Sequence, residues 1–153
     1  MTTEIEERSL QPQPTAVIRA TAPIEHVGAA LGELLPKLGE YLEMQQVPVA
    51  GAPFTRYLTV GEQVEIEAGI PVATAVDGEG VIAPGELPGG RAIVAVYTGP
   101  YDGLAEPHSA IQQWLTEHGL EPAGPPWEAY LTGDTGASPG QRITEVVYPL
   151  DNA

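Results

Sequence analysis

Cysteine is absent from this chain, so disulfide bonds and thiolate metal sites are excluded. Basic residues are also few, because 6 Lys and Arg face 21 Asp and Glu and leave a formal net charge of -15. Such a chain repels phosphate backbones, and we expect no direct binding of nucleic acid. No apolar run approaches the roughly 20 residues of a membrane helix, and the first residues lack a secretory signal pattern. The sequence predicts a soluble cytoplasmic protein that does not enter a membrane.

Metal and cofactor motifs are missing as well. His26, His108 and His118 are scattered, and no two of them have the spacing of metal ligands. No glycine-rich loop combines with a lysine in the pattern that cradles phosphate groups. We therefore predict neither a metal nor a cofactor.

The main positive signal is an internal duplication. Residues 50–59 (AGAPFTRYLT) match residues 123–132 (AGPPWEAYLT), 73 positions further along, with Ala-Gly, Pro, an aromatic and Tyr-Leu-Thr in register. A second pair of segments, 67–72 and 145–150, also matches, with Glu67 in the place of Glu145. Two copies are too few for a solenoid, so the duplication predicts a closed pseudo-twofold domain.

Hydrophobic periodicity assigns the same elements to both copies. Residues 1–14 are polar and acidic and are predicted to form a mobile tail. The predicted elements of the first copy, 15–76, are a strand at 15–20, a helix to about 44, and strands at 53–60 and 62–72. The loop 77–90 leads to the second copy, 91–150, with a strand at 92–97, a helix from about 106, and strands at 127–132 and 142–150. The fold class is α+β, with two main helices on an antiparallel sheet.

The ordered motifs of the second copy resemble those of the GyrI-like, or bacterial effector-binding, domain family. They are 87–92 (LPGGRA), 98–104 (TGPYDGL), 114–115 (WL), 127–131 (WEAYL) and 144–150 (TEVVYPL). With the first copy, the likeness covers residues 15–150. The resemblance implies two β-α-β-β modules with a ligand cleft between them. In that family, an aromatic pocket with a buried glutamate takes up lipophilic cations, and some members hydrolyse cyclopropanoid or related electrophilic toxins.

Glu128 is the residue that the resemblance assigns to this pocket. Strand alternation places its side chain on one face with Tyr130 and places Trp127 on the other face. No Arg, Lys or His lies in this segment to pair with the carboxylate, so an organic cation is its expected partner. The first copy has Thr55 at the matching position, and this asymmetry is what a single-ligand cleft requires.

Aromatic residues of both copies are candidate walls of the cleft, although aromatics in a sheet are more often ordinary core. The candidates are Tyr57, Tyr97, Tyr101, Trp127, Tyr130 and Tyr148, with Phe54 in reserve. Glu145 is a further candidate. Its repetition as Glu67 indicates either two site carboxylates or two solvent-facing strand residues.

Three functions fit these features. The first is a stand-alone protein that binds lipophilic, often cationic, aromatic compounds. The second is a hydrolase in which Glu128 or Glu145 acts as general base on a water while a tyrosine hydroxyl supports the leaving group. The third is an interaction protein with a protein partner, since stand-alone GyrI-like members include an inhibitor of DNA gyrase.

Overall fold

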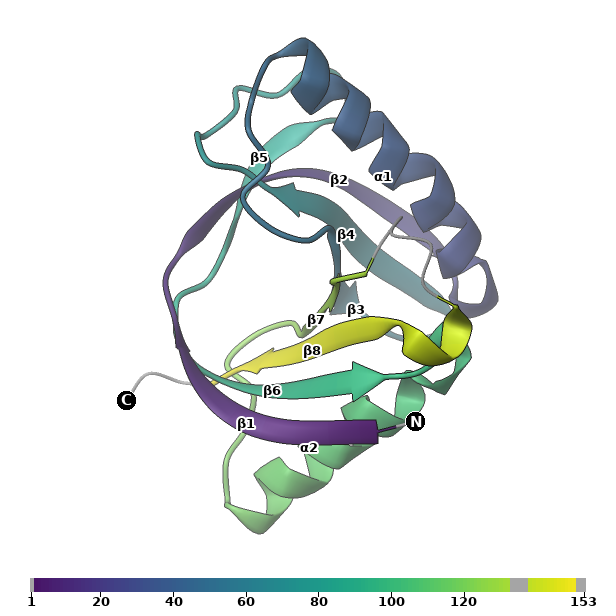
Figure 1. Ribbon diagram of the computed structural model, residues 1–153, viewed down its shortest axis with the longest axis vertical. Helices are drawn as coiled ribbons and strands as arrows, with labels where there is room; N and C mark the ends of the chain where they lie inside the picture. The colour runs from purple at the N-terminus through teal and green to yellow at the C-terminus, as the bar shows by residue number, and fades with distance from the viewer. Residues whose placement is uncertain (1, 133–137, 151–153) are drawn as a thin grey trace. The chain divides into compact units, whose positions relative to one another are not determined.

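The computed structural model describes residues 2–132 and 138–150 (Figure 1). The chain forms two compact units. Unit 1 comprises Met1–Gln11 and Gly89–Ala153, and unit 2 comprises Pro12–Pro88. No helix among the described residues is long and apolar enough to cross a membrane.

Unit 2 contains one four-stranded antiparallel sheet and one long helix. Its elements are β2 (Gln13–Pro23), the 3-10 turn η1 (Ile24–His26), α1 (Val27–Met44), β3 (Phe54–Thr59), β4 (Gln63–Pro71) and β5 (Ala83–Leu87). The strands are paired in the order β5-β2-β4-β3. The helix α1 lies along β2 and β4, as Figure 1 shows, and buries Leu38 and Leu42 against Ala16, Ile18 and Ile70.

Unit 1 repeats this arrangement. Its elements are β1 (Thr2–Leu10), β6 (Gly90–Thr98), η2 (Tyr101–Gly103), α2 (Ala105–Glu117), β7 (Trp127–Tyr130), η3 (Pro139–Gln141) and β8 (Ile143–Pro149). The strands are paired in the order β1-β6-β8-β7. The helix α2 packs against β6 and β8 through Ile111 and Leu115, which contact Ile93, Ala95 and Val146. Each such fully buried aliphatic side chain stabilises the unit by roughly 1.5–3 kcal/mol.

The strand register confirms the duplication seen in the sequence. Thr55 faces Ala68 in the β3–β4 pair, and Glu128 faces Val146 at the equivalent place in the β7–β8 pair. The same backbone hydrogen bond also precedes both pairs: Ala50 donates to the Pro71 carbonyl (2.9 Å), and its counterpart Ala123 donates to the Pro149 carbonyl (2.7 Å). The α+β class and the order strand, helix, strand, strand are confirmed for both copies.

Two predictions about the segments outside the repeats are wrong. Residues 1–14 are not a mobile tail, because Thr2–Leu10 pairs along its whole length with β6. The sequence of β1 has the composition of a tail because its charged residues suit an edge strand, where they discourage further pairing. Ile5 packs on the core. The loop 77–90 likewise contains β5, which pairs with β2.

Gly69 is a position where the sheet tolerates no side chain. It lies opposite Phe54, and a Cβ atom placed on it would fall within 3 Å of three carbons of the Phe54 ring. Phe54 is only 1% exposed, so its ring has little room to move. We expect Gly69→Ala to lower the free energy of unfolding by about 1–3 kcal/mol, as overpacking does in other cores. Urea denaturation measures this change.

The matched control is Gly39→Ala, in the middle of α1, where nothing lies within 4 Å of the added methyl group. Alanine should stabilise that helix position by about 0.5–1 kcal/mol. Equal stability of Gly69→Ala and the wild type would show that the ring does not constrain this position.

Candidate ligand-binding site in unit 1

Glu128 lies in β7 and is buried, with 5% of its surface exposed. It shares its face of the sheet with Tyr130 and with Val146 of the neighbouring strand. This is the face that α2 covers, since Val146 packs on Ile111 and Leu115 of the helix. Trp127 points to the opposite face and is also buried, so the predicted alternation along β7 is confirmed.

Tyr130 and His108 contact the Glu128 carboxylate. The Tyr130 hydroxyl donates to Oε1 at 2.9 Å, and His108 Nε2 lies 2.7 Å from Oε2. The expectation that no basic group pairs with Glu128 is therefore wrong. The segment around Glu128 contains no such residue, but α2 brings His108 to it from 20 positions earlier in the chain.

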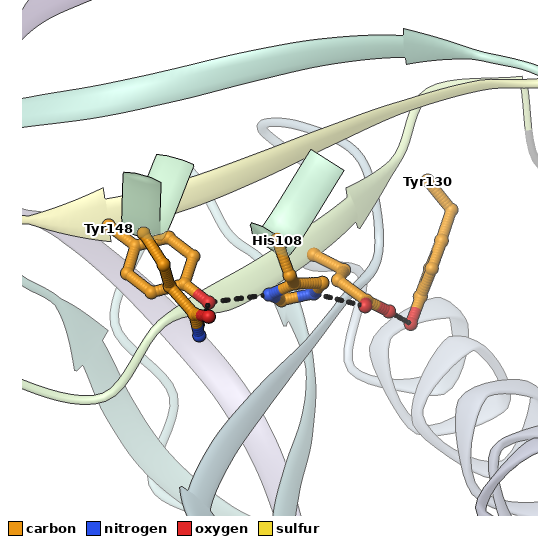
Figure 2. A network of polar contacts seen from close by, with 5 residues as sticks. His108, Tyr130 and Tyr148 are labelled. Carbon is orange, nitrogen blue, oxygen red and sulfur yellow. Dashed lines mark hydrogen bonds and ion pairs between the residues drawn. The ribbon is translucent and has the colours of Figure 1, made fainter. Parts of the chain in front are cut away.

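The imidazole of His108 extends this contact into a longer network. Its other ring nitrogen, Nδ1, lies 2.7 Å from the Tyr148 hydroxyl, and the two rings meet edge to face at 5.6 Å. Gln112, one turn further along α2, donates its side-chain amide to the same hydroxyl at 3.3 Å. Figure 2 shows the His108 ring with Tyr148 on one side and the contacts leading to Tyr130 on the other.

Tyr148 joins two side chains of α2. Its oxygen accepts the Gln112 amide and lies 2.7 Å from His108 Nδ1. The phenol either donates to this nitrogen or accepts a hydrogen from it, according to the tautomer of the imidazole. Hydrogen bonds thus connect one carboxylate, one imidazole and two phenols in a single network.

Tyr101 and Arg142 extend the site toward solvent. The Tyr101 ring, 37% exposed, meets the Tyr130 ring edge to face at 5.6 Å. The guanidinium carbon of Arg142 lies 4.6 Å from the centre of the Tyr101 ring, which is the geometry of a cation-π contact. Unit 1 thus contains an aromatic surface that already holds one cation, next to a buried carboxylate.

The other predicted site residues of unit 1 have structural partners of their own. Tyr97 is fully buried and donates its hydroxyl to the Pro100 carbonyl at 2.8 Å. Burial is the main cause that raises the pKa of its phenol. Glu145 lies in β8 on the face of Trp127, and its Oε2 is 2.8 Å from Arg8 Nη2. Neither residue belongs to the network around Glu128 that these contacts define.

Phe54 and Tyr57, the remaining predicted wall residues, belong to unit 2. Phe54 packs over Gly69, and Tyr57 packs against the cluster of Val64 and Ile66. The meeting of aromatics from both copies in one cleft stays a prediction. Among the described residues, no group of three or more His, Asp or Glu side chains could hold a metal ion.

The sequence analysis missed His108, Gln112 and Arg142. A signal for the first two exists in the helix period. His108 lies four positions after Leu104 and three before Ile111. The side chains of Leu104 and Ile111 both pack on the core. That spacing puts His108 on the inner face of α2, and Gln112 follows at i+4. Arg142 gives no such signal, because its contact with Tyr101 depends on the course of the chain between β7 and β8.

The comparison with protein-family models decides the family. The model described as "GyrI-like small molecule binding domain" matches residues 3–151, nearly the whole chain. The chain belongs to the GyrI-like family. Membership confirms the resemblance noted in the sequence and shows that this GyrI-like chain is a small-molecule-binding domain. No curated protein matches it.

Solved structures of other proteins share the GyrI-like fold. The EcmrR C-terminal domain is 19% identical, with all of both chains covered and a TM-score of 0.88. The match to EcmrR in its complex with DNA covers 99% of this GyrI-like chain but only 58% of the EcmrR chain, at 19% identity and a TM-score of 0.86. SAV2435, solved bound to tetraphenylphosphonium, is 14% identical over 97% of this chain and 94% of its own (TM-score 0.70). A hydrolase from Listeria innocua is 12% identical over 97% and 92% (TM-score 0.65).

The ionisation of the Tyr148 hydroxyl makes the free energy of unfolding of unit 1 depend on pH in the alkaline range. Burial is the main cause that raises the pKa of this phenol; the Gln112 hydrogen bond lowers it and the charge of Glu128 raises it further. Because the pKa is higher in the folded state, the stabilisation is complete below the unfolded value near 10 and is lost as the pH rises through the folded value.

We therefore expect Tyr148→Phe to lower the unfolding free energy near neutral pH by about 1–2 kcal/mol, through the lost hydrogen bonds to His108 and Gln112. The gap between wild type and variant should narrow between about pH 8 and about pH 11, because only the wild type loses the phenol contribution. Chemical denaturation of both proteins at both pH values measures the difference between their free energies of unfolding. A gap of constant size would contradict the assigned burial of the Tyr148 proton.

Proposed function

We propose that this GyrI-like domain binds lipophilic cationic and aromatic compounds, and that the Glu128 carboxylate provides the countercharge. The observation that carries the proposal is a buried carboxylate that Tyr130 and His108 hold in place. The two contacts orient the carboxylate next to the aromatic rings of Tyr130 and Tyr101.

Electrostatics favours a cation of one particular kind. A positive charge about 4 Å from Glu128 gains roughly 4 kcal/mol at an effective dielectric of 20, before desolvation costs. Small inorganic cations lose strong hydration on entry, whereas a large organic cation is weakly hydrated and adds apolar contact area. The net charge of -15 further favours cations at long range.

The aromatic side chains supply the second part of the recognition. Tyr130 is partly exposed, and its hydroxyl touches the carboxylate while its ring contacts Tyr101. Arg142 on the Tyr101 ring supports the view that this surface accepts a cation, with each ring face adding about 0.5–2 kcal/mol. Such a site selects by charge and aromatic area, so it accepts several unrelated compounds. The bound tetraphenylphosphonium of SAV2435 is a compound of this class.

The proposal predicts a charge-dependent loss of binding in Glu128→Gln. We expect tetraphenylphosphonium to bind the wild type saturably. The variant should bind it at least about tenfold more weakly, because the lost electrostatic attraction exceeds about 1.4 kcal/mol, which is the free energy of a tenfold change in affinity. Isothermal titration calorimetry measures both affinities. Triphenylphosphine oxide, which has similar rings and no net charge, should bind both proteins with similar weak affinity.

The matched control is Glu145→Gln, a carboxylate of the neighbouring strand whose partner is Arg8. It should retain the wild-type affinity for tetraphenylphosphonium. Equal binding by Glu128→Gln and the wild type, or a larger loss in Glu145→Gln, would assign the countercharge to a residue other than Glu128.

The contact between His108 and Glu128 favours a second candidate, a hydrolase of strained-ring electrophiles. A carboxylate and an imidazole in hydrogen-bond contact can take a proton from a water, and the Tyr130 or Tyr148 hydroxyl can donate one to the oxygen that leaves a ring carbon. The water then adds to that carbon, so that an epoxide becomes a diol. A solved structure of the same fold is described as a hydrolase.

Hydrolysis of styrene oxide, followed by chromatography of the diol, tests this candidate. We expect turnover in the wild type and at least about a hundredfold lower rate in both Glu128→Gln and His108→Gln, since general acid-base catalysis contributes about 10²–10⁴. Undiminished turnover in both variants would show that Glu128 and His108 do not catalyse the reaction. Binding of tetraphenylphosphonium without any diol formation would leave binding as the function.

A further inference from the structure

Unit 2 contains a hollow that the site around Glu128 does not use. Its volume is about 560 Å³, within the range of small-molecule pockets. It lies over the face of the sheet opposite α1, since Arg19, Arg56 and Glu67 line it and alternate with the residues that pack on the helix. The exposed Val81 contributes to its rim.

Three charged side chains form a row across the wall of this hollow. Glu67 of β4 faces Arg56 of β3 on one side and Arg19 of β2 on the other. Arg19 Nε donates to Glu67 Oε2 at 3.2 Å, whereas Arg56 Nη1 is 3.8 Å from Oε1, beyond hydrogen-bond distance. The Glu67 side chain is 4% exposed. The row therefore has two guanidinium groups, one on either side of one buried carboxylate, and Glu86 adds a second carboxylate to the lining of the hollow.

Arg56 is the group of this row that lacks an acceptor. Its side chain is 19% exposed, and its Nε is buried with no hydrogen-bond partner among the described residues. A buried donor without a partner is costly, and a guanidinium matches a carboxylate through two parallel hydrogen bonds. An anion that enters the hollow and contacts Arg56 would supply the missing acceptor.

The second copy shows that the fold does not require this row. At the positions equivalent to Arg56, Glu67 and Arg19, unit 1 has Ala129, Glu145 and Val96, which face one another in the same register. Duplication therefore kept the glutamate, while the two cross-strand arginines are present in the first copy alone.

The rest of the lining is small and apolar except for Glu86 at the end of β5. Val17 and Ala83 face each other across β2 and β5 and line it together with Pro84 and Gly85. A Cβ atom on Gly85 would lie 2.8 Å from Thr15 Oγ1, so the close approach of the two strands at this point requires glycine.

We propose that this hollow is a second binding site, for a small molecule with one carboxylate and an apolar body. The carboxylate binds Arg56, and the apolar body lies on Val17, Ala83 and Pro84. The site is independent of the proposed function, because it lies in unit 2 and selects the opposite charge from Glu128. A neutral or cationic compound of the same shape leaves Arg56 Nε without an acceptor and binds more weakly.

A ¹⁵N NMR titration of the full chain with 2-naphthoate tests the proposal. The amide signals of Val17, Ala83 and Gly85 should shift saturably, while those of His108 and Glu128 stay in place. The neutral 2-naphthamide should bind at least about tenfold more weakly, since a hydrogen-bonded charge is lost. Binding of tetraphenylphosphonium in the same sample reports separately on the site around Glu128.

Two variants locate the anchor. Arg56→Gln should weaken binding of 2-naphthoate at least about tenfold and reduce its preference over 2-naphthamide. Ala83→Leu fills the hollow from an exposed position on β5, so it keeps the fold and should also weaken binding at least about tenfold. Glu145→Gln, a carboxylate of unit 1 whose partner is Arg8, is the matched control and should bind 2-naphthoate as the wild type does.

Several results would overturn the proposal. They are the absence of saturable shifts at Val17, Ala83 and Gly85, equal affinity for the acid and the amide, and unchanged binding in Ala83→Leu. Any of them would show that the row of Arg19, Glu67 and Arg56 is an ion-pair cluster that only stabilises the sheet.

Discussion

The burial of one carboxylate is the constraint on which the candidate site depends. Glu128 lies under α2 with 5% exposure, and a charge in such a place is stable only with close polar partners. The helix supplies His108 at 2.7 Å and β7 supplies Tyr130 at 2.9 Å. Tyr148 contacts the far side of the imidazole, so the orientation of His108, and with it that of the carboxylate, is fixed from both sides. In the proposed function, a weakly hydrated organic cation offsets the charge of this carboxylate.

The two copies of the duplicated module carry different chemistry on the same frame. Each copy consists of four antiparallel strands and one long helix. Each also has a glutamate at the same register position, Glu67 in unit 2 and Glu145 in unit 1. Unit 1 has a carboxylate at Glu128, where unit 2 has the buried Thr55. Unit 2 has arginines beside Glu67 where unit 1 has Ala129 and Val96. Equivalent register positions thus carry a buried carboxylate in one unit and two arginines in the other, and this difference is the basis of the two proposed sites.

The sequence predicted the fold well because the repeat and the periodicity are strong local signals. The order of elements and the alternation of Trp127 with Glu128 follow from them, whereas the burial of Glu128 was expected from the family resemblance. The strand β1 could not be predicted, since an acidic edge strand has the composition of a tail and its pairing with β6 joins residues about 90 positions apart. The partner His108 was missed for a similar reason: a contact between a helix and a strand 20 residues later depends on packing, which local composition does not report.

A crystal structure of the chain with tetraphenylphosphonium would test the central claim most directly. The account predicts that the phosphonium centre lies next to the Glu128 carboxylate, with phenyl rings against Tyr130 and Tyr101, and that His108 stays in contact with both Glu128 and Tyr148. A ligand bound with no atom in contact with Glu128, Tyr130 or Tyr101 would contradict it.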